Sequence, residues 1–320
     1  MPEAARFHPQ EPGVLYLAEG GTETEVMFRH GHPLREFAMF ELVDVAQAME
    51  DLRGMYRRYL DQAAEHGFAA LMAGLDYRAS PDWGRKLGYS DAALADMQVR
   101  CIDFLREVAR PYEGHLPRIA ICGCVGPRGD AYALNRDITE ESAEEYHATQ
   151  LETLRACGVD LVWAATFNNI PEAVGLSRAA AAARLPVNLS FTLTGESRLR
   201  SGPTLREAIE QTDARAGEAA PDSYGINCSH PMEFEPALEP RDWSRRLRSL
   251  RPNAAKMEKV ALCKLGHIEE GDPEELAAMM GDLARRYPQV DIWGGCCGSW
   301  DRHLGLIAEA VRAARLEEVG

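Results

Sequence analysis

Basic residues are scarce in this chain, and long apolar runs are absent from it. Lysine and arginine together number 35 against 50 acidic residues, so the formal net charge is −15. A strongly acidic surface repels phosphate backbones, and nucleic acid is therefore not expected as a partner. No window approaches the ~20 apolar residues that a membrane helix needs, so the sequence predicts no membrane span.

The chain also lacks a leader-like segment, a spacer and any CxxC pair. Residues 1–13 have neither the apolar core nor the cationic start of a secretory signal, so we expect a cytoplasmic protein. Its 8 cysteines are then reduced thiols, some of them metal ligands or catalytic groups. Without a Ser/Gly tract or a Pro-rich run, we predict one domain over residues 1–320. The oligomeric state stays open, with a homo-oligomer among the options.

Short apolar segments alternate with longer amphipathic ones along the whole chain. The apolar segments, often next to Gly or Pro, predict buried strands near residues 14, 68, 118, 160, 186, 223, 254 and 290. The intervening patterns predict helices over 44–66, 90–109, 139–157, 171–184, 204–216, 236–250, 273–286 and 301–316. Eight repeats over this length indicate the α/β class and a (β/α)8 TIM barrel. A doubly wound sheet is the alternative, but the EGGTETE turn after the first strand is not GxGxxG.

Three cysteines lie where the sixth and eighth predicted strands end. Cys228 closes GINC, while Cys296 and Cys297 lie between glycines in GGCCG. In a barrel of this type the active site forms at the strand ends, so these thiols are expected to meet there. Three thiolates suit Zn²⁺, and three protein ligands leave a fourth position open, which is typical of a catalytic site. Buried cysteines that only pack are the alternative, which we prefer for the other five.

These segments carry a family resemblance. The chain resembles the homocysteine S-methyltransferase family in EGGTETE from Glu19, GPRGD from Gly126, GINC, PNAA from Pro252, and GGCCG followed by His303. The motifs are spread over nearly the whole chain, and GINC with GGCCG is the specific part. The resemblance implies a (β/α)8 barrel with zinc on the three cysteines. It also implies a role in methionine biosynthesis.

The implied chemistry is methyl transfer to a thiol. Entering the open zinc position, the thiol of homocysteine or a related acceptor loses its proton. Its sulfur then attacks the methyl group of a sulfonium or quaternary ammonium donor in line, and the metal serves as activator and template. A neutral group leaves a cationic donor, so little acid catalysis is needed.

Candidate substrate contacts cluster at the predicted strand ends. The backbone N–H groups of Gly20, Gly21 and Thr22 are candidates for a carboxylate, Glu19 for an ammonium group, and Asn227 for orienting the acceptor. Aromatic faces hold cationic donors, and the long predicted loop over 76–90 is expected to help form the donor pocket. The aromatic candidates are Tyr77, Trp83, Tyr89, Phe167, Trp293 and Trp300. His230 is a candidate fourth ligand or a hydrogen-bonding loop residue, and His303 a structural residue.

Two positions depart from the family pattern. When Thr166 and Asn169 are aligned on TxxNxxEA, Ala165 falls where the family usually carries a glutamate that contacts the amino group of the acceptor. Glu23 replaces the usual small residue after the EGG turn. Either Glu23 supplies the missing contact or the acceptor is not homocysteine. Two further readings are a demethylase that serves donor catabolism and a non-catalytic zinc or thiol-binding protein.

Overall fold

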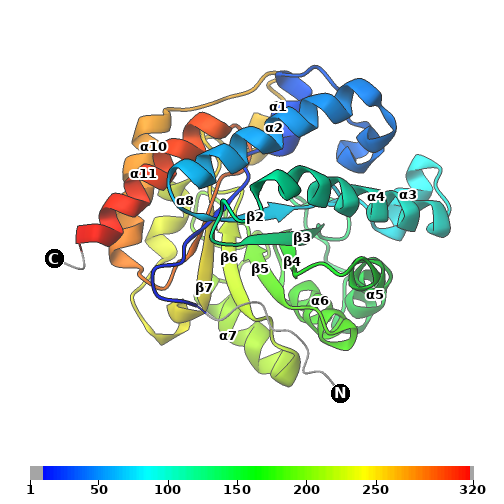
Figure 1. Ribbon diagram of the computed structural model, residues 1–320. Coiled ribbons are helices and arrows are strands. Elements are labelled where there is room, and N and C mark those ends of the chain that lie inside the picture. Colours follow the sequence, from blue (N-terminus) through cyan, green and yellow to red (C-terminus); the bar gives the residue numbers. More distant parts are fainter. Residues whose placement is uncertain (1–9, 318–320) are drawn as a thin grey trace.

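The computed structural model describes residues 10–317, which form a closed barrel of eight parallel strands with helices around it (Figure 1). The strands are β1 (Tyr16–Ala18), β2 (Ala69–Ala73), β3 (Ile119–Val125), β4 (Leu161–Phe167), β5 (Val187–Phe191), β6 (Ser223–Asn227), β7 (Leu247–Arg251) and β8 (Ile292–Trp293). Each strand pairs with its successor, and β8 pairs with β1 in the register Tyr16 to Ile292. The predicted (β/α)8 barrel is confirmed.

Helices connect the strands on the outside of the barrel. They are α1 (Thr22–Phe28), α2 (Ala46–Glu65), α3 (Pro81–Leu87), α4 (Asp91–Ala109), α5 (Glu140–Cys157), α6 (Ile170–Ala183), α7 (Leu205–Ala216), α8 (Pro231–Phe234), α9 (Lys259–Cys263), α10 (Pro273–Arg286) and α11 (Asp301–Glu317). Short 3-10 turns cover Arg35–Phe37, Met39–Asp44, Arg110–Tyr112, Gly217–Ala219, Glu235–Ala237 and Asp242–Arg246. Helix α11 packs against both α10 and α2, and so completes the outer ring (Figure 1).

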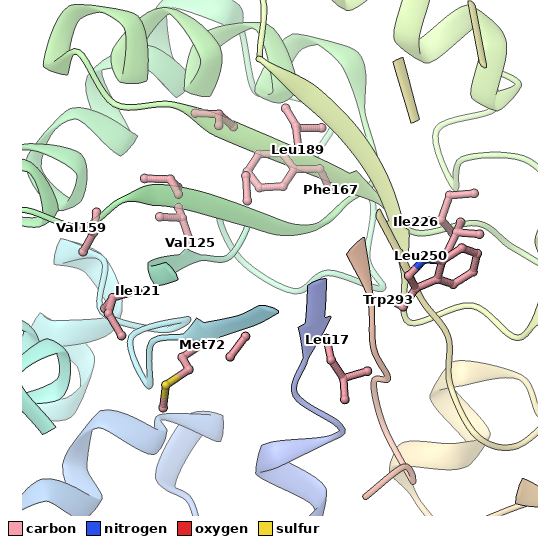
Figure 2. Packing of buried hydrophobic residues seen from close by; sticks show 14 of the residues in the cluster. Leu17, Met72, Ile121, Val125, Val159, Phe167, Leu189, Ile226, Leu250 and Trp293 are labelled. Carbon is pink, nitrogen blue, oxygen red and sulfur yellow. The ribbon is translucent and has the colours of Figure 1, made fainter. Parts of the chain in front are cut away.

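Side chains of the strands alternate between two apolar layers, because successive residues of a strand point to opposite faces. Tyr16 and Ile292 belong to the layer inside the barrel. Their neighbours Leu17 and Trp293 belong to the layer between the barrel and the helices, which Figure 2 shows. This alternation decides which residues at a strand end can reach the central cavity.

One part of the predicted element order is wrong. The helix expected over 236–250 is instead a run of short helical turns followed by β7, and the strand expected near Ala254 lies in a loop. Strand β7 was hard to see because two arginines interrupt its apolar pattern in LRSLR, and both are paired with acids inside the fold. The loop predicted over 76–90 contains α3, which the sequence did not reveal.

The predicted helices elsewhere are confirmed to within a few residues. Among residues 10–317, none of the helices combines the length and the apolar character that a bilayer crossing requires. The two ends of the predicted domain, residues 1–9 and 318–320, lie outside the described residues, and so does most of the segment assessed as a leader.

Helix α5 offers a direct test of the local sequence signals. Thr139 caps its N-terminus by accepting a hydrogen bond from the N–H of Ser142 at 3.2 Å, and Ser142 Oγ accepts one from the N–H of Thr139 at 3.0 Å. Thr139→Ala is expected to lower the free energy of unfolding by about 1 kcal/mol in urea titrations. Thr149→Ala, at an exposed position inside the same helix, is the control and should be neutral or slightly stabilising. Equal effects of the two changes would contradict the capping role.

Candidate active site and metal centre

The ends of the strands surround a cavity of about 520 Å³. Of the residues singled out from the sequence, the cavity is lined by Glu19, Gly20, Gly21, Thr22, Glu23, Trp83, Asn227, Cys228, Cys296 and Cys297. Ala165 lines it as well. Trp293 does not: it is fully buried in the outer apolar layer, because the alternation along β8 points it away from the barrel axis. The expectation that Trp293 contacts substrate is therefore wrong.

The three predicted cysteines meet at this cavity. Cys228 comes from the end of β6, and Cys296 and Cys297 follow β8; their sulfur atoms all lie within 4.8 Å of one another. Cys228 Sγ and Cys297 Sγ are 3.9 Å apart. A tetrahedral zinc site with bonds of about 2.3 Å to sulfur separates its sulfurs by roughly 3.8 Å, so this spacing suits the metal. Among the described residues these three form the one cluster of potential metal ligands.

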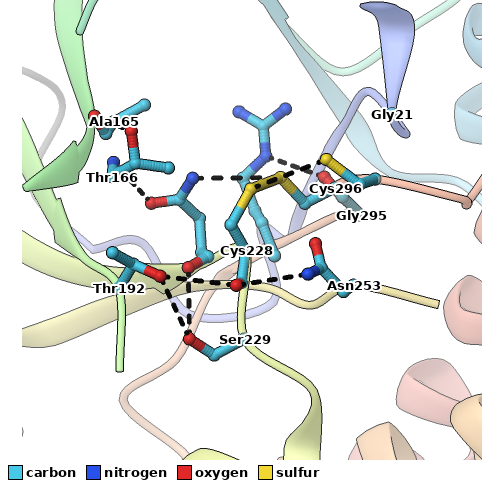
Figure 3. Close-up of a disulfide and its surroundings, with 12 residues drawn as sticks. Gly21, Ala165, Thr166, Thr192, Cys228, Ser229, Asn253, Gly295 and Cys296 are labelled. Carbon is cyan, nitrogen blue, oxygen red and sulfur yellow. Dashed lines mark hydrogen bonds between the residues drawn. A yellow bond between two sulfur atoms is a disulfide. The ribbon is translucent and has the colours of Figure 1, made fainter. Parts of the chain in front are cut away.

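Cys228 and Cys296 are joined by a disulfide in the structure (Figure 3). Metal binding requires thiolates, so this bond must be reduced before both residues can act as ligands. The same close approach that allows the bond also brings both sulfurs within reach of one ion. The arrangement therefore describes an oxidised form of a site whose reduced form offers three thiolates.

The backbone at Cys228 has an unusual conformation. The residue has a φ of 51°, in the left-handed region that residues other than glycine rarely adopt. Its N–H donates to Arg251 O at 3.2 Å, and its carbonyl accepts from Asn253 Nδ2 at 3.2 Å. Such strain costs of order 1–3 kcal/mol and persists only where surrounding contacts hold it. Here those contacts come from the β7 end, and they turn Cys228 off its strand toward the other two cysteines.

The loop with Cys296 and Cys297 packs directly on the turn after β1. A Cβ added to Gly20 would collide with Ser299 O, and one added to Gly21 would collide with Cys296 O and Cys297 Cα. The N–H of Gly21 donates to Ser299 O at 2.8 Å. The EGG motif is therefore a packing requirement: two glycines let the backbone of the turn approach the cysteine loop.

Asn227 links the cysteine cluster to the end of β4. Its Oδ1 accepts from the N–H of Thr166 at 2.8 Å, and its Nδ2 lies 3.9 Å from Cys296 Sγ (Figure 3). Thr166 also has a positive φ, of 62°, and its hydroxyl is hydrogen-bonded to Tyr77 at 2.5 Å. An amide N–H beside a thiolate stabilises the charged form of the sulfur. Asn227 thus contacts Cys296, a candidate metal ligand, and is not an isolated turn residue.

Glu19 does not face the cavity as an unpaired acid. Its Oε2 accepts a hydrogen bond from Arg251 Nη2 at 2.7 Å, and its Oε1 accepts one from the N–H of Ala73. Both members of the pair are almost fully buried. The guanidinium of Arg251 also lies over the indole ring of Trp163, 3.4 Å from its centroid. The sequence pattern did not single out Arg251, because it ends a strand whose other residues, 247–250, were predicted to be helical.

The backbone donors proposed for a carboxylate are mostly engaged within the protein. Besides the Gly21 bond to Ser299, the N–H of Thr22 donates to Gly20 O at 3.1 Å. Glu23 accepts a hydrogen bond from the hydroxyl of Thr22 at 3.0 Å. Burial raises the pKa of the Glu23 carboxyl, so its neutral form is favoured relative to an acid in water.

Trp83 lies on α3 at the rim of the cavity, where cations of the protein cover its ring. Arg78 lies 4.4 Å and Lys86 4.8 Å from the ring centroid. The aromatic character predicted for this rim is present, but its cation–π capacity is shared with these two side chains.

The histidines have structural roles. His230 Nδ1 accepts from the N–H of Met232 at 3.3 Å and caps α8, and burial lowers its pKa. Buried His303 accepts from the N–H of Trp300 at 3.3 Å and lies 2.8 Å from Glu270 O through its other ring nitrogen. Neither joins the ligand cluster of the described residues. Among the described residues, no histidine therefore fills the fourth metal position, an arrangement that would have favoured the non-catalytic reading.

Comparison with known proteins places this site in a family. The family model described as homocysteine S-methyltransferase matches residues 16–311. The chain belongs to the homocysteine S-methyltransferase family. It is 22% identical to homocysteine S-methyltransferase 4 of Zea mays, over 99% of this chain and 95% of that one. It is 25% identical to homocysteine S-methyltransferase of Escherichia coli K12, over 67% and 69%.

Solved structures show the same fold. The metallated form of the homocysteine methyltransferase MmuM from Escherichia coli superimposes with a TM-score of 0.71 at 18% identity, covering 93% of this methyltransferase and 96% of that chain. The oxidised form of MmuM gives 0.70 at 20% identity, covering 92% and 94%. Within the family fold, Ala165 of this methyltransferase lines the cavity at the end of β4.

Metal content tests the cysteine assignment. After reduction and loading, the wild-type methyltransferase is expected to retain about one equivalent of Zn²⁺, because three thiolates hold the ion tightly. Changing Cys228, Cys296 or Cys297 to Ser should each reduce retained zinc to a small fraction after dialysis, measured by inductively coupled plasma mass spectrometry.

The control is Cys157→Ser, at the partly exposed end of α5, which should leave zinc content unchanged. Unreduced protein should take up little zinc. Full zinc retention in any one of the three serine variants would remove that residue from the ligand set.

Proposed function

We propose that this protein is a zinc-dependent S-methyltransferase that moves a methyl group from a sulfonium or quaternary ammonium donor to the thiol of homocysteine or a related acceptor. The observation that carries the proposal is the meeting of three cysteine sulfurs at the wall of a cavity large enough for two small substrates. A cytoplasmic location and a role in methionine supply are part of the same proposal.

The donor set argues for zinc over other ions. Three sulfur ligands are soft, which disfavours Mg²⁺ and Ca²⁺, and the 3.9 Å between Cys228 Sγ and Cys297 Sγ suits a tetrahedral zinc site. Without a fourth ligand among the described residues, the reduced site keeps a position for an added thiol. When bound, zinc would lower the pKa of that thiol and hold its sulfur in place.

The residues around the cysteines keep the candidate metal ligands in one orientation. Asn227 donates toward Cys296, and the Cys228 backbone is fixed by Asn253 and by the end of β7. The acceptor sulfur needs a line of approach to the methyl carbon from the side opposite the leaving atom of the donor. Fixing both reactants in one cavity contributes much of the rate, since effective molarities for well-oriented groups are large.

The donor is expected to enter from the side of α3. Trp83 and Tyr77 line the cavity there, and the bond between Tyr77 and Thr166 ties this wall to the end of β4. A sulfonium or ammonium donor leaves as a neutral molecule, so no residue has to protonate it. We therefore assign this wall a binding role and assign no general acid.

A donor screen tests the proposal. Reduced, zinc-loaded protein with homocysteine should form a methyl thioether with at least one of betaine, S-methylmethionine, S-adenosylmethionine and dimethylsulfoniopropionate, measured by mass spectrometry. Cys297→Ser should lower turnover more than about 100-fold, because it removes a metal ligand. Cys157→Ser should retain wild-type turnover. Stoichiometric binding of zinc and thiol with no turnover on any donor would contradict the proposal.

A further inference from the structure

Arg251 is a buried cation at the cavity that the proposed reaction has not used. It ends β7, the strand between the two that precede the metal ligands, and it lines the cavity with an exposed fraction of 2%. Its neighbours along the barrel wall are the ends of β6 and β8. A group on this strand can therefore reach a molecule whose sulfur is held by Cys228, Cys296 and Cys297.

The guanidinium is held firmly, yet one of its nitrogens has no partner. Nη2 donates to Glu19 Oε2 at 2.7 Å, Nε lies 3.4 Å from Gly295 O, and the plane stacks on Trp163. Nη1 is buried and has no hydrogen-bond partner among the described residues. An unpaired donor on a buried charge is costly, and a bound carboxylate would satisfy it.

The same cavity has few acidic groups available to bind the ammonium end of an amino acid. Glu19 is neutralised by Arg251, and position 165 is an alanine. Glu23, the other acid of the EGG turn, forms no salt bridge among the described residues, and it accepts a hydrogen bond from Thr22. The N–H groups of Gly21 and Thr22, which could hold a carboxylate, donate within the protein.

We propose that Arg251 is the carboxylate receptor of the acceptor subsite, and that the preferred acceptor is a short thiol carboxylate without a requirement for an α-ammonium group. The inference rests on the proposed function, because it places the sulfur of the acceptor at the three cysteines. Arg251 presents Nη1 to the carboxylate, Glu19 fixes the other side of the fork, and Trp163 keeps the plane in position. Ala165 leaves room where an ammonium-binding acid would otherwise lie.

Four thiols separate the contributions of the two charged groups. Homocysteine carries both, 4-mercaptobutyrate lacks only the ammonium group, 3-aminopropanethiol lacks only the carboxylate, and 4-mercapto-1-butanol carries neither. Binding is followed on Co²⁺-substituted protein by the sulfur-to-cobalt charge-transfer absorption, which reports thiolate ligation without turnover. Wild-type protein should bind 4-mercaptobutyrate at least as tightly as it binds homocysteine. It should bind 3-aminopropanethiol at least about tenfold more weakly than 4-mercaptobutyrate.

Two variants test the role of Arg251 itself. Arg251→Lys keeps the charge that Glu19 needs but loses the fork, so it should weaken 4-mercaptobutyrate binding about tenfold while leaving 4-mercapto-1-butanol nearly unchanged. The pair Glu19→Gln with Arg251→Gln removes both charges and should abolish the preference for the carboxylate. Retained binding of 4-mercapto-1-butanol in each variant shows that the metal site is intact.

The outcomes distinguish this inference from the proposed function. If homocysteine binds at least tenfold more tightly than 4-mercaptobutyrate and Glu23→Gln removes that difference, Glu23 is the ammonium receptor and the inference is wrong. An effect of Arg251→Lys confined to the KM of the methyl donor would assign the arginine to the donor and also overturn the inference. If none of the four thiols changes the cobalt spectrum, the proposed function itself fails.

Discussion

The packing of the EGG turn against the Cys296–Cys297 loop is the contact on which the site depends. Strand β1 meets β8 only because the barrel closes, and this closure brings residues nearly 280 positions apart into register. Gly20 and Gly21 then allow the two backbones to touch without a Cβ between them. Cys228 reaches the same point from β6 through a left-handed backbone conformation. The sulfur cluster is thus a product of barrel closure and not of local spacing.

A second constraint on the site is electrostatic. The cavity contains a buried ion pair between Glu19 and Arg251, stacked on Trp163. Removing such charges from water costs several kcal/mol per ion, and their attraction repays this only with good geometry and further hydrogen bonds. Nη1 of Arg251 is left without such a bond among the described residues, so the pair is incomplete as a purely structural element. Ligand recognition accounts for both its position and its open donor.

Much of the architecture follows from the sequence because the barrel repeats one pattern. Apolar strands beside Gly or Pro and capped amphipathic helices recur regularly, so errors in one repeat do not hide the rest. Strand β7 was not predicted because its two arginines look out of place in a buried strand. Their partners, Asp291 and Glu19, are brought near only by the tertiary fold. Similarly, α3 was not predicted because its segment was interpreted as a loop, and the role of Arg251 was not predicted because its strand was not.

The candidate site likewise contains residues that could be predicted from the sequence and residues that could not. The cysteines could be recognised because their residue type, the glycines beside them and their places at strand ends all indicate one chemistry. The prediction that Trp293 contacts substrate failed because the register of a two-residue strand decides whether a side chain points inward. The sequence did not determine that register. The roles of Glu19 and Gly21 depend on partners in Arg251 and Ser299, which only the folded chain brings near.

The most direct test of the account is the coordination of the metal before and after a thiol is added. Extended X-ray absorption fine structure at the zinc edge of the reduced, loaded protein should show three sulfur ligands at about 2.3 Å and one lighter atom. Addition of a thiol acceptor should convert this to four sulfurs. A first shell that already contains four protein ligands, or a sulfur count that does not change with the thiol, would contradict the open metal position on which the proposed methyl transfer rests.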